Sequence, residues 1–184
     1  MNVLMISSSP RKGGNSDTLA DAFVNGALDA GHVVEKVNLY DKVISFCKGC
    51  LACQKTKRCV IHDDADDIAQ KMLTTDVIVF ATPIYYYEMC GQMKTMLDRT
   101  NPLYSSDYAF RDIYLLATAA DEDVHSVDGA LKGLSGWISC FERARLSGTV
   151  FAGGVDAVGD IQGHPSLNQA YEMGKGVGRN GVVE

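Results

Sequence analysis

The chain has 184 residues, six of them cysteines, and a formal net charge of −6. A chain of this length buries about 70% of its unfolded surface, so we expect one domain over residues 1–184 that needs no disulfides. The acidic balance argues against binding to nucleic acid or anionic membranes, and no apolar stretch approaches the roughly 18 residues of a spanning helix. Because no hydrophobic leader precedes the first apolar run, we expect a cytoplasmic protein whose cysteines serve metal or redox chemistry.

Short apolar runs alternate with segments of helical periodicity along the whole chain. Strands are predicted at about residues 3–6, 33–39, 76–81, 113–119 and 149–152. Helices are predicted at about 19–31, from an Asp63 or Asp64 cap onward, and at 91–103, 129–145 and 166–177. The strand centres are almost continuously apolar, as in a parallel sheet with helices on both faces. The pattern therefore predicts an α/β, doubly wound, five-stranded fold.

The segment between the first strand and helix is dense in hydroxyls and glycines: Ser7-Ser8-Ser9-Pro10-Arg11-Lys12-Gly13-Gly14-Asn15-Ser16-Asp17-Thr18. It offers amides at a helix start, hydroxyl donors and cations, which together suit a phosphate at the carboxyl end of a strand. Neither a Gly-x-Gly-x-x-Gly fingerprint nor a P-loop ending is present, which disfavours a dinucleotide or triphosphate as the tight ligand. A monophosphate is the predicted ligand, and a surface loop with an Asn or Ser helix cap is the alternative.

This segment resembles the Ser-x-Ser-Pro-Arg-x-x-Gly-Asn-Ser phosphate loop of the NADPH-dependent FMN reductase branch of the flavodoxin-like superfamily. Ala81-Thr82-Pro83-Ile84-Tyr85-Tyr86 and the following Gly91-Gln92-Met93-Lys94 are similar to that family's flavin-ring loop and its next helix. Gly159-Asp160-Ile161 and the last helix resemble its carboxyl-terminal pattern. The resemblance implies a flavodoxin-like sheet in the order 2-1-3-4-5.

The resemblance also implies site residues. The FMN phosphate would be held by Ser9, Arg11, Asn15, Ser16 and Thr18, and the isoalloxazine ring lined by Pro83, Ile84, Tyr85 and Tyr86. Ala119, in the loop after the fourth strand, would approach the flavin as well. Tyr87 and Glu88 depart from the family, whose members often have small residues at these positions.

Four cysteines, Cys47, Cys50, Cys53 and Cys59, fall within thirteen residues of a loop at 46–60, after the second strand. Their spacing lets one short loop bind a 4Fe-4S cubane, and it is similar to the motif of archaeal-type iron-sulfur flavoproteins. A zinc site and a set of reactive free thiols are the alternatives, with Cys59 and His62 able to form a second zinc arm. Nearby cations (Lys48, Lys55, Lys57 and Arg58) would stabilise a cluster, attract an acidic partner or the extra phosphate of NADPH, or form a solvated loop. Cys90 and Cys140 are expected to pack in the interior.

The leading functional hypothesis is an FMN-dependent NAD(P)H oxidoreductase, for which the sequence indicates no catalytic acid or base. Its acceptor would be a small molecule such as free flavin, a quinone or an azo compound. The first alternative is an electron carrier with FMN and a 4Fe-4S cluster and a ferredoxin-like partner. The expected assembly of the chain is a homodimer or homotetramer. The second is a redox-sensing flavin-binding protein without turnover.

Overall fold

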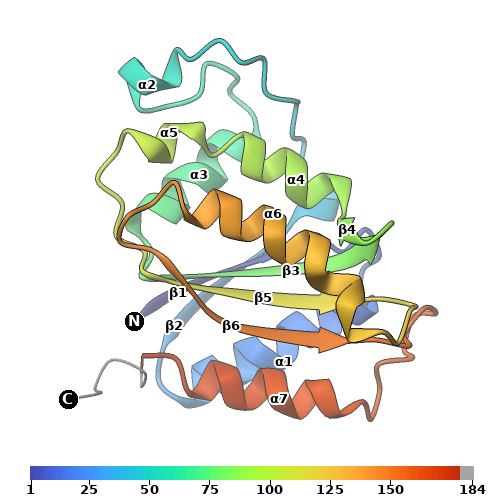
Figure 1. Ribbon diagram of the computed structural model, residues 1–184. Helices are drawn as coiled ribbons and strands as arrows, with labels where there is room; N and C mark the ends of the chain where they lie inside the picture. The colour runs from blue at the N-terminus through green and yellow to red at the C-terminus, as the bar shows by residue number, and fades with distance from the viewer. Residues whose placement is uncertain (179–184) are drawn as a thin grey trace.

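The computed structural model describes residues 1–178, which form a twisted sheet with helices on both faces (Figure 1). The strands are β1 (Asn2–Ser7), β2 (Val33–Asn38), β3 (Val77–Tyr85), β4 (Glu88–Met89), β5 (Asp112–Thr118) and β6 (Arg145–Ala152). Five of them pair in parallel in the order β2-β1-β3-β5-β6, and the two-residue β4 pairs only with β3 in antiparallel fashion. The predicted flavodoxin-like order is confirmed, since β5 and β6 are the fourth and fifth strands of that prediction.

Two layers of helices cover the sheet. One layer is α1 (Asn15–Asp29) and α7 (Pro165–Lys175), which lie side by side below it (Figure 1). The other face carries α3 (Asp64–Thr74), α4 (Gly91–Asp98), α5 (Asn101–Tyr104) and α6 (Asp128–Ile138). A four-residue helix, α2 (Cys53–Thr56), lies beyond α5 in the cysteine loop, and short 3-10 turns at Leu39–Asp41 and Val124–Val127 complete the elements.

The strand alternation divides the core in two. Val3, Met5 and Val79 face α1 and α7, whereas their neighbours Leu4 and Ile78 face the α3, α4 and α6 layer. All of them are buried, which explains why the strands read as unbroken apolar runs rather than as alternating ones. The rigid sheet holds the loops at its carboxyl edge in place, where ligands of such folds bind.

Several predicted elements differ from the structure in their bounds; among them, α1 begins earlier than predicted, at Asn15, and β3 runs on to Tyr85. The predicted helix at 91–103 breaks at Arg99 and Thr100 into α4 and α5, because Pro102 cannot continue a helix but suits the first turn of a new one. The helix predicted to run to residue 145 ends at Ile138, and β6 begins earlier, at Arg145. The Asp63 cap is confirmed, because its carboxylate accepts a hydrogen bond from the Ala65 amide. None of the helices between residues 1 and 178 is long and apolar enough to cross a membrane.

Candidate flavin cavity and cysteine segment

The loop between β1 and α1 is closed by its own polar groups. The hydroxyl of Ser9 donates to the carbonyl of Arg11 at 2.8 Å, and the Gly14 amide donates to the same carbonyl at 3.0 Å. A Cβ atom at Gly14 would lie only 2.8 Å from Ser9 Oγ, so glycine lets the chain fold back this tightly. Ser8 fastens the loop to the end of β3, because its amide and its hydroxyl both donate to the Ala81 carbonyl.

The first turn of α1 is left without a side-chain cap. Gly14 occupies the N-cap position and has no side chain that could accept a hydrogen bond. The first amides of the helix therefore have no side-chain partner. Asp17 lies in that turn, but its carboxylate accepts from Ser7 Oγ at 3.2 Å and from the Gly13 amide at 3.1 Å. Lys36 on β2 neutralises Asp17 at 2.7 Å. The turn therefore suits an anion, as a phosphate requires.

A cavity of about 160 Å³ opens at this turn, at the carboxyl edge of the sheet. Its lining comes from four segments at the carboxyl ends of the strands: Ser9, Pro10, Arg11, Gly14, Asn15, Ser16, Pro83, Ile84, Tyr85, Thr118, Ala119, Ala120, Val155 and Asp156. One side is polar and includes Ser16, whose hydroxyl lies 2.7 Å from that of Thr118. The other side is apolar and comes from β3 and the loop after β5. A phosphate and a flat ring would each meet the surface it needs, so the residues fit FMN.

Eight of the ten predicted flavin residues meet at this cavity, and two do not. Ser9, Arg11, Asn15, Ser16, Pro83, Ile84, Tyr85 and Ala119 are all part of its lining. Thr18 lies farther along α1, half-buried and outside the lining, and the side chain of Tyr86 is 100% exposed. The contacts of these ten residues with the cofactor stay predictions.

Arg11 and Asn15 also hold the loop that follows β6. The amide nitrogen of Asn15 donates to the Ala157 carbonyl at 2.9 Å, and its oxygen accepts from the Gly159 amide at 3.2 Å and more weakly from Ile161. Arg11 donates to the Asp156 carbonyl at 2.9 Å. This role could not be predicted from the loop alone, although the family's Gly-Asp-Ile pattern marks the segment that Asn15 binds. Asp17, Thr118 and Val155 were missed as well.

The predicted ring loop is largely strand. β3 continues through Thr82 and Pro83 to Tyr85, then turns at Tyr86 and Tyr87 into β4. Behind this wall lies Cys90, fully buried as predicted; its thiol donates to Ser8 Oγ at 3.1 Å and its amide to Thr82 Oγ1 at 3.2 Å. Cys140, in contrast, is exposed, because it follows the end of α6 instead of lying on its inner face.

The cysteine segment, residues 46–60, forms a second cavity of about 310 Å³. All four predicted ligands, Cys47, Cys50, Cys53 and Cys59, line it as free thiols. Cys47 and Cys50 are exposed, Cys53 is buried and Cys59 is half-buried. Within residues 1–178 no three His, Cys, Asp or Glu side chains converge closely enough for a single metal ion. A cubane places its four thiolates farther apart than a single ion does, so the four cysteines around one cavity fit a cluster.

Two sulfur atoms of this cavity accept hydrogen bonds from residues beyond α4. The guanidinium of Arg99 donates to Cys59 Sγ at 3.3 Å, and the amide of Asn101 donates to Cys53 Sγ at 3.1 Å. Arg99 is only 2% exposed and is paired with Asp63 at 2.8 Å. Burial lowers the pKa of Arg99, but its hydrogen bonds to Asp63 and Cys59 outweigh burial and leave the pKa above its ordinary value.

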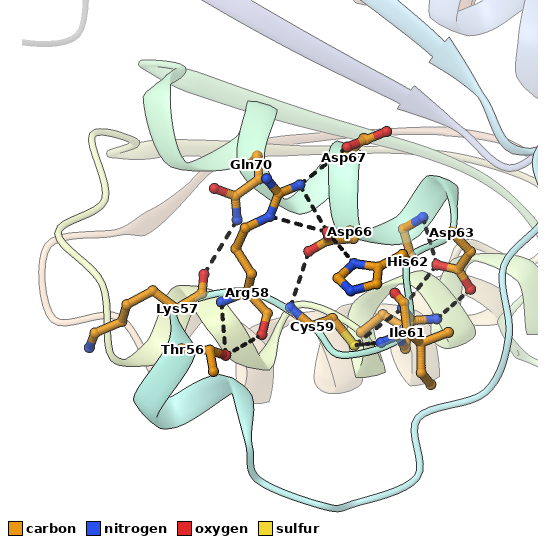
Figure 2. A network of polar contacts seen from close by, with 12 residues as sticks. Thr56, Lys57, Arg58, Cys59, Ile61, His62, Asp63, Asp66, Asp67 and Gln70 are labelled. Carbon is orange, nitrogen blue, oxygen red and sulfur yellow. Dashed lines mark hydrogen bonds and ion pairs between the residues drawn. The ribbon is translucent and has the colours of Figure 1, made fainter.

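Two carboxylates at the start of α3, the N-cap Asp63 and Asp66 in the first turn, hold the chain on both sides of the segment (Figure 2). Asp63 accepts from the Ser45 amide at 2.8 Å, and Asp66 accepts from the Cys59 amide at 3.1 Å and from Arg58 at 2.9 Å. Burial raises the pKa of Asp63, yet the hydrogen bonds from Arg99 and Ser45 more than offset this and leave the pKa below its usual value. Arg58 is engaged by Asp66 and Lys57 by the Ser105 carbonyl, whereas in the described residues no ion pair or side-chain hydrogen bond engages the ammonium groups of Lys48 and Lys55.

A family model and several curated proteins match this chain in sequence. The family model for NADPH-dependent FMN reductases matches residues 1–173. An iron-sulfur flavoprotein of Archaeoglobus fulgidus is 37% identical over 55% of this chain and 46% of its own length, and one of Methanosarcina thermophila is 34% identical over 61% and 59%. These matches thus span about half the length of the curated relatives.

Solved structures share the fold at low identity. The NAD(P)H:quinone oxidoreductase from Methanothermobacter marburgensis superposes with a TM-score of 0.77 at 16% identity, covering 100% of this chain and 99% of that one. The azoreductase AzrA superposes with a TM-score of 0.72 at 18% identity, covering 95% and 99%. The match of the family model over almost the whole chain shows that the protein belongs to the NADPH-dependent FMN reductase family.

Proposed function

We propose that this protein is an FMN-dependent NAD(P)H oxidoreductase. The observation that carries the proposal is the cavity at the carboxyl edge of the sheet, where the uncapped turn of α1 meets the apolar wall of Pro83, Ile84 and Tyr85. FMN bound there would supply a ring that accepts hydride and passes two electrons to an acceptor. The chain supplies the binding, orientation and exclusion of water.

Each part of the cavity has a separate task in this proposal. The first amides of α1, with the hydroxyls of Ser9 and Ser16 and the cation of Arg11, hold the phosphate. Asp17 and Lys36 keep that loop in shape without adding net charge. Pro83, Ile84 and Ala119 shield the faces of the ring from water, and no side chain is needed as an acid or base because the flavin carries the hydride chemistry.

The proposal extends to features that the sequence predicts. The chain acts as a single domain in the cytoplasm, as a homodimer or homotetramer, and passes its electrons to a small molecule. Light scattering on the purified protein measures the oligomeric state. The part of the domain between residues 179 and 184 lies outside the described residues.

FMN titration of the purified protein tests the binding site. Wild type should bind about one FMN per chain, and Ser16→Ala should weaken binding about tenfold, the effect of losing one charge-assisted hydrogen bond. Ser139→Ala, in an exposed position after α6, serves as the matched control and should bind as wild type does. A wild-type protein that binds no FMN and oxidises neither NADH nor NADPH would rule out the proposal.

A second function is favoured by the cysteine cavity, namely an electron carrier with FMN and a 4Fe-4S cluster. Cys47, Cys50, Cys53 and Cys59 surround one space, and two of the sulfurs already have N–H donors. Such donors stabilise thiolate ligands and tune a cluster. A ferredoxin-like protein with an acidic surface would dock at Lys48 and Lys55. Anaerobically purified protein should then contain about four iron and four sulfide per chain, and their absence would reject this function.

A further inference from the structure

The hairpin between β3 and β4 turns on two tyrosines in a strained conformation. Tyr85 pairs with Glu88, so Tyr86 and Tyr87 are the only residues of the turn. Their φ angles are +51° and +64°, in the left-handed region that a two-residue type I′ turn requires. Asn-Gly and Gly-Gly are the usual occupants, because a bulky L-residue pays a steric cost at positive φ. Two consecutive tyrosines therefore make this turn less stable than the usual residues would.

Burial of the two side chains does not offset the steric cost of this backbone conformation. Tyr86 is 100% exposed and Tyr87 is 63% exposed, so neither ring gains from a core. The hydroxyl of Tyr87 donates to Asp121 at 3.3 Å, a long bond on the surface. Exposed aromatic side chains on a strained backbone are features of binding sites, where the gain comes from a ligand. We name Tyr86 and Tyr87 the tyrosine tip.

The tyrosine tip continues the wall of the flavin cavity. Tyr85, directly before it, lines that cavity, as does Ala120, which directly precedes Asp121 in the loop after β5. The bond from Tyr87 to Asp121 therefore joins two of the loops that form the cavity. An acceptor that reaches the edge of the ring would pass beside the tip.

The tip is also held in place by α6. A Cβ atom at Gly129 would lie 2.2 Å from the Tyr87 carbonyl oxygen, so α6 packs directly against the turn. The Glu88 carboxylate accepts from the Met89 amide at 2.7 Å and lies near Gly133 of the same helix. A turn fixed in this way presents its rings in a constant position and loses little entropy when a ligand binds.

The charges near the tip select the kind of ligand. Glu88 and Asp121 flank it, and Glu122 and Asp123 follow in the same loop. The hydrogen bond from the Asp123 amide holds the pKa of Asp121 below its ordinary value, so this group is negative at neutral pH. An acceptor that carries negative charge beside the tip would be repelled, whereas an uncharged planar ring would stack on tyrosine.

We propose that the tyrosine tip is an aromatic platform that stacks planar, uncharged acceptors of the quinone class beside the flavin and discriminates against anionic acceptors. This inference rests on the proposed oxidoreductase function. In the reaction, NAD(P)H and one proton are consumed, and the quinone takes up two electrons and two protons in all to become the hydroquinone. Tyr86 and Tyr87 bind the quinone and take no part in the proton transfer.

The test replaces the tip by the residues that its turn prefers. Tyr86→Asn combined with Tyr87→Gly removes both rings and relieves the strain, and Tyr104→Asn, at an exposed tyrosine on α5, is the matched control. The FMN-loaded proteins are compared with menadione, an uncharged two-ring quinone, and with ferricyanide, an anion without a planar ring. The expected result is a fall of about tenfold in the ratio of kcat/KM for menadione to that for ferricyanide, the loss of one or two stacking contacts. The Tm should rise by about 2–4 °C.

Two results would overturn the platform. An unchanged acceptor ratio in the tip variant would show that the tyrosines do not select the acceptor. A lower molecular mass by light scattering, with that ratio unchanged, would assign the tip to contact with a second copy of the chain. A wild-type protein that turns over neither acceptor contradicts the proposed function itself, and the two failures are therefore distinguishable.

Discussion

All the non-glycine residues of 1–178 that have positive φ lie in the cysteine segment or directly beside the flavin cavity, yet these two regions are held in different ways. Tyr86 and Tyr87 have positive φ beside the cavity, and Leu51 and Lys57 have positive φ in the segment. The cavity is built on the ends of strands whose side chains fill the core. The segment has no strand and is anchored by Asp63, Asp66 and Arg99.

This difference separates two kinds of stability. The walls of the cavity belong to the cooperative core, so they should open only when the sheet unfolds. The segment depends on a few charged hydrogen bonds, so it should open locally at a smaller cost. Four changes test the distinction, from the largest expected effect to the smallest.

Arg99→Met should have the largest effect. It removes a buried cation with five hydrogen bonds and leaves the Asp63 carboxylate without its partner, which should lower the free energy of unfolding by about 3–5 kcal/mol. Denaturant unfolding measures the loss. Arg145→Met breaks an ion pair whose arginine is exposed, and should cost less than about 1 kcal/mol.

The same variant shows where the loss falls. Alkylation of Cys59 should become much faster in Arg99→Met, while the folded protein keeps its FMN. Loss of FMN together with the faster alkylation would mean that the two regions unfold as one unit.

Asn15→Ala should affect the cavity and spare the segment. It removes three hydrogen bonds to the loop at 157–161, at a cost of about 2–3 kcal/mol, and should raise the Kd for FMN at least about tenfold. Chemical unfolding and FMN titration measure the two effects, and alkylation of Cys59 should stay at the wild-type rate. Gln70→Ala, which removes an exposed contact to Lys57, is the control and should leave the FMN affinity unchanged.

Asp63→Asn tests the charge that anchors the segment, since asparagine also caps helices well. The pKa of Asp63 is lowered in the folded chain, so its ionised form contributes stability that is fully present above the unfolded value of about 3.9 and is lost as the pH falls through the folded value. The wild type should exceed the variant by about 1–2 kcal/mol at pH 7. That gap should close at the acid end of a series of unfolding measurements, and a gap constant with pH would contradict the role of the charge.

Asn101→Ala should have the smallest effect and applies to the cluster-bearing form. The N–H donor to the Cys53 sulfur stabilises the more negative, reduced state of a cluster. Because the variant lacks this donor, the midpoint potential should fall by up to about 60 mV. A redox titration followed by electron paramagnetic resonance measures the potential, and iron content serves as the control for cluster loss. A midpoint potential that rises or stays unchanged would mean that this hydrogen bond does not tune the cluster as proposed.

The fold could be predicted because its signals are local. Apolar strand runs, the Asp63 cap and the hydroxyl-rich loop each depend on residues adjacent in sequence. The resemblance to the family brought together the predicted cavity residues from three loops. Pro102 carried a local signal for the break after α4, whereas the burial of Arg99 at that break has no such signal.

The contacts of Arg99, Asn15 and Asp17 could not be predicted in the same way. Arg99 and Asn15 link segments far apart in the chain, Arg99 with Cys59 and Asn15 with Gly159, and Asp17 reaches Lys36 on the neighbouring strand. The turn at the tyrosine tip could not be predicted for another reason. Its two tyrosines are not the residues that a type I′ turn favours. Local sequence rules for turns therefore do not predict this hairpin.

Reduction of the bound flavin by a nicotinamide is the most direct test of the central claim. FMN-loaded protein is mixed anaerobically with one equivalent of NADPH or of NADH, and the absorption band at about 450 nm is followed in time. The account predicts that this band bleaches nearly completely with at least one of the two donors. A band that persists with both, in protein that holds one FMN per chain, would contradict it.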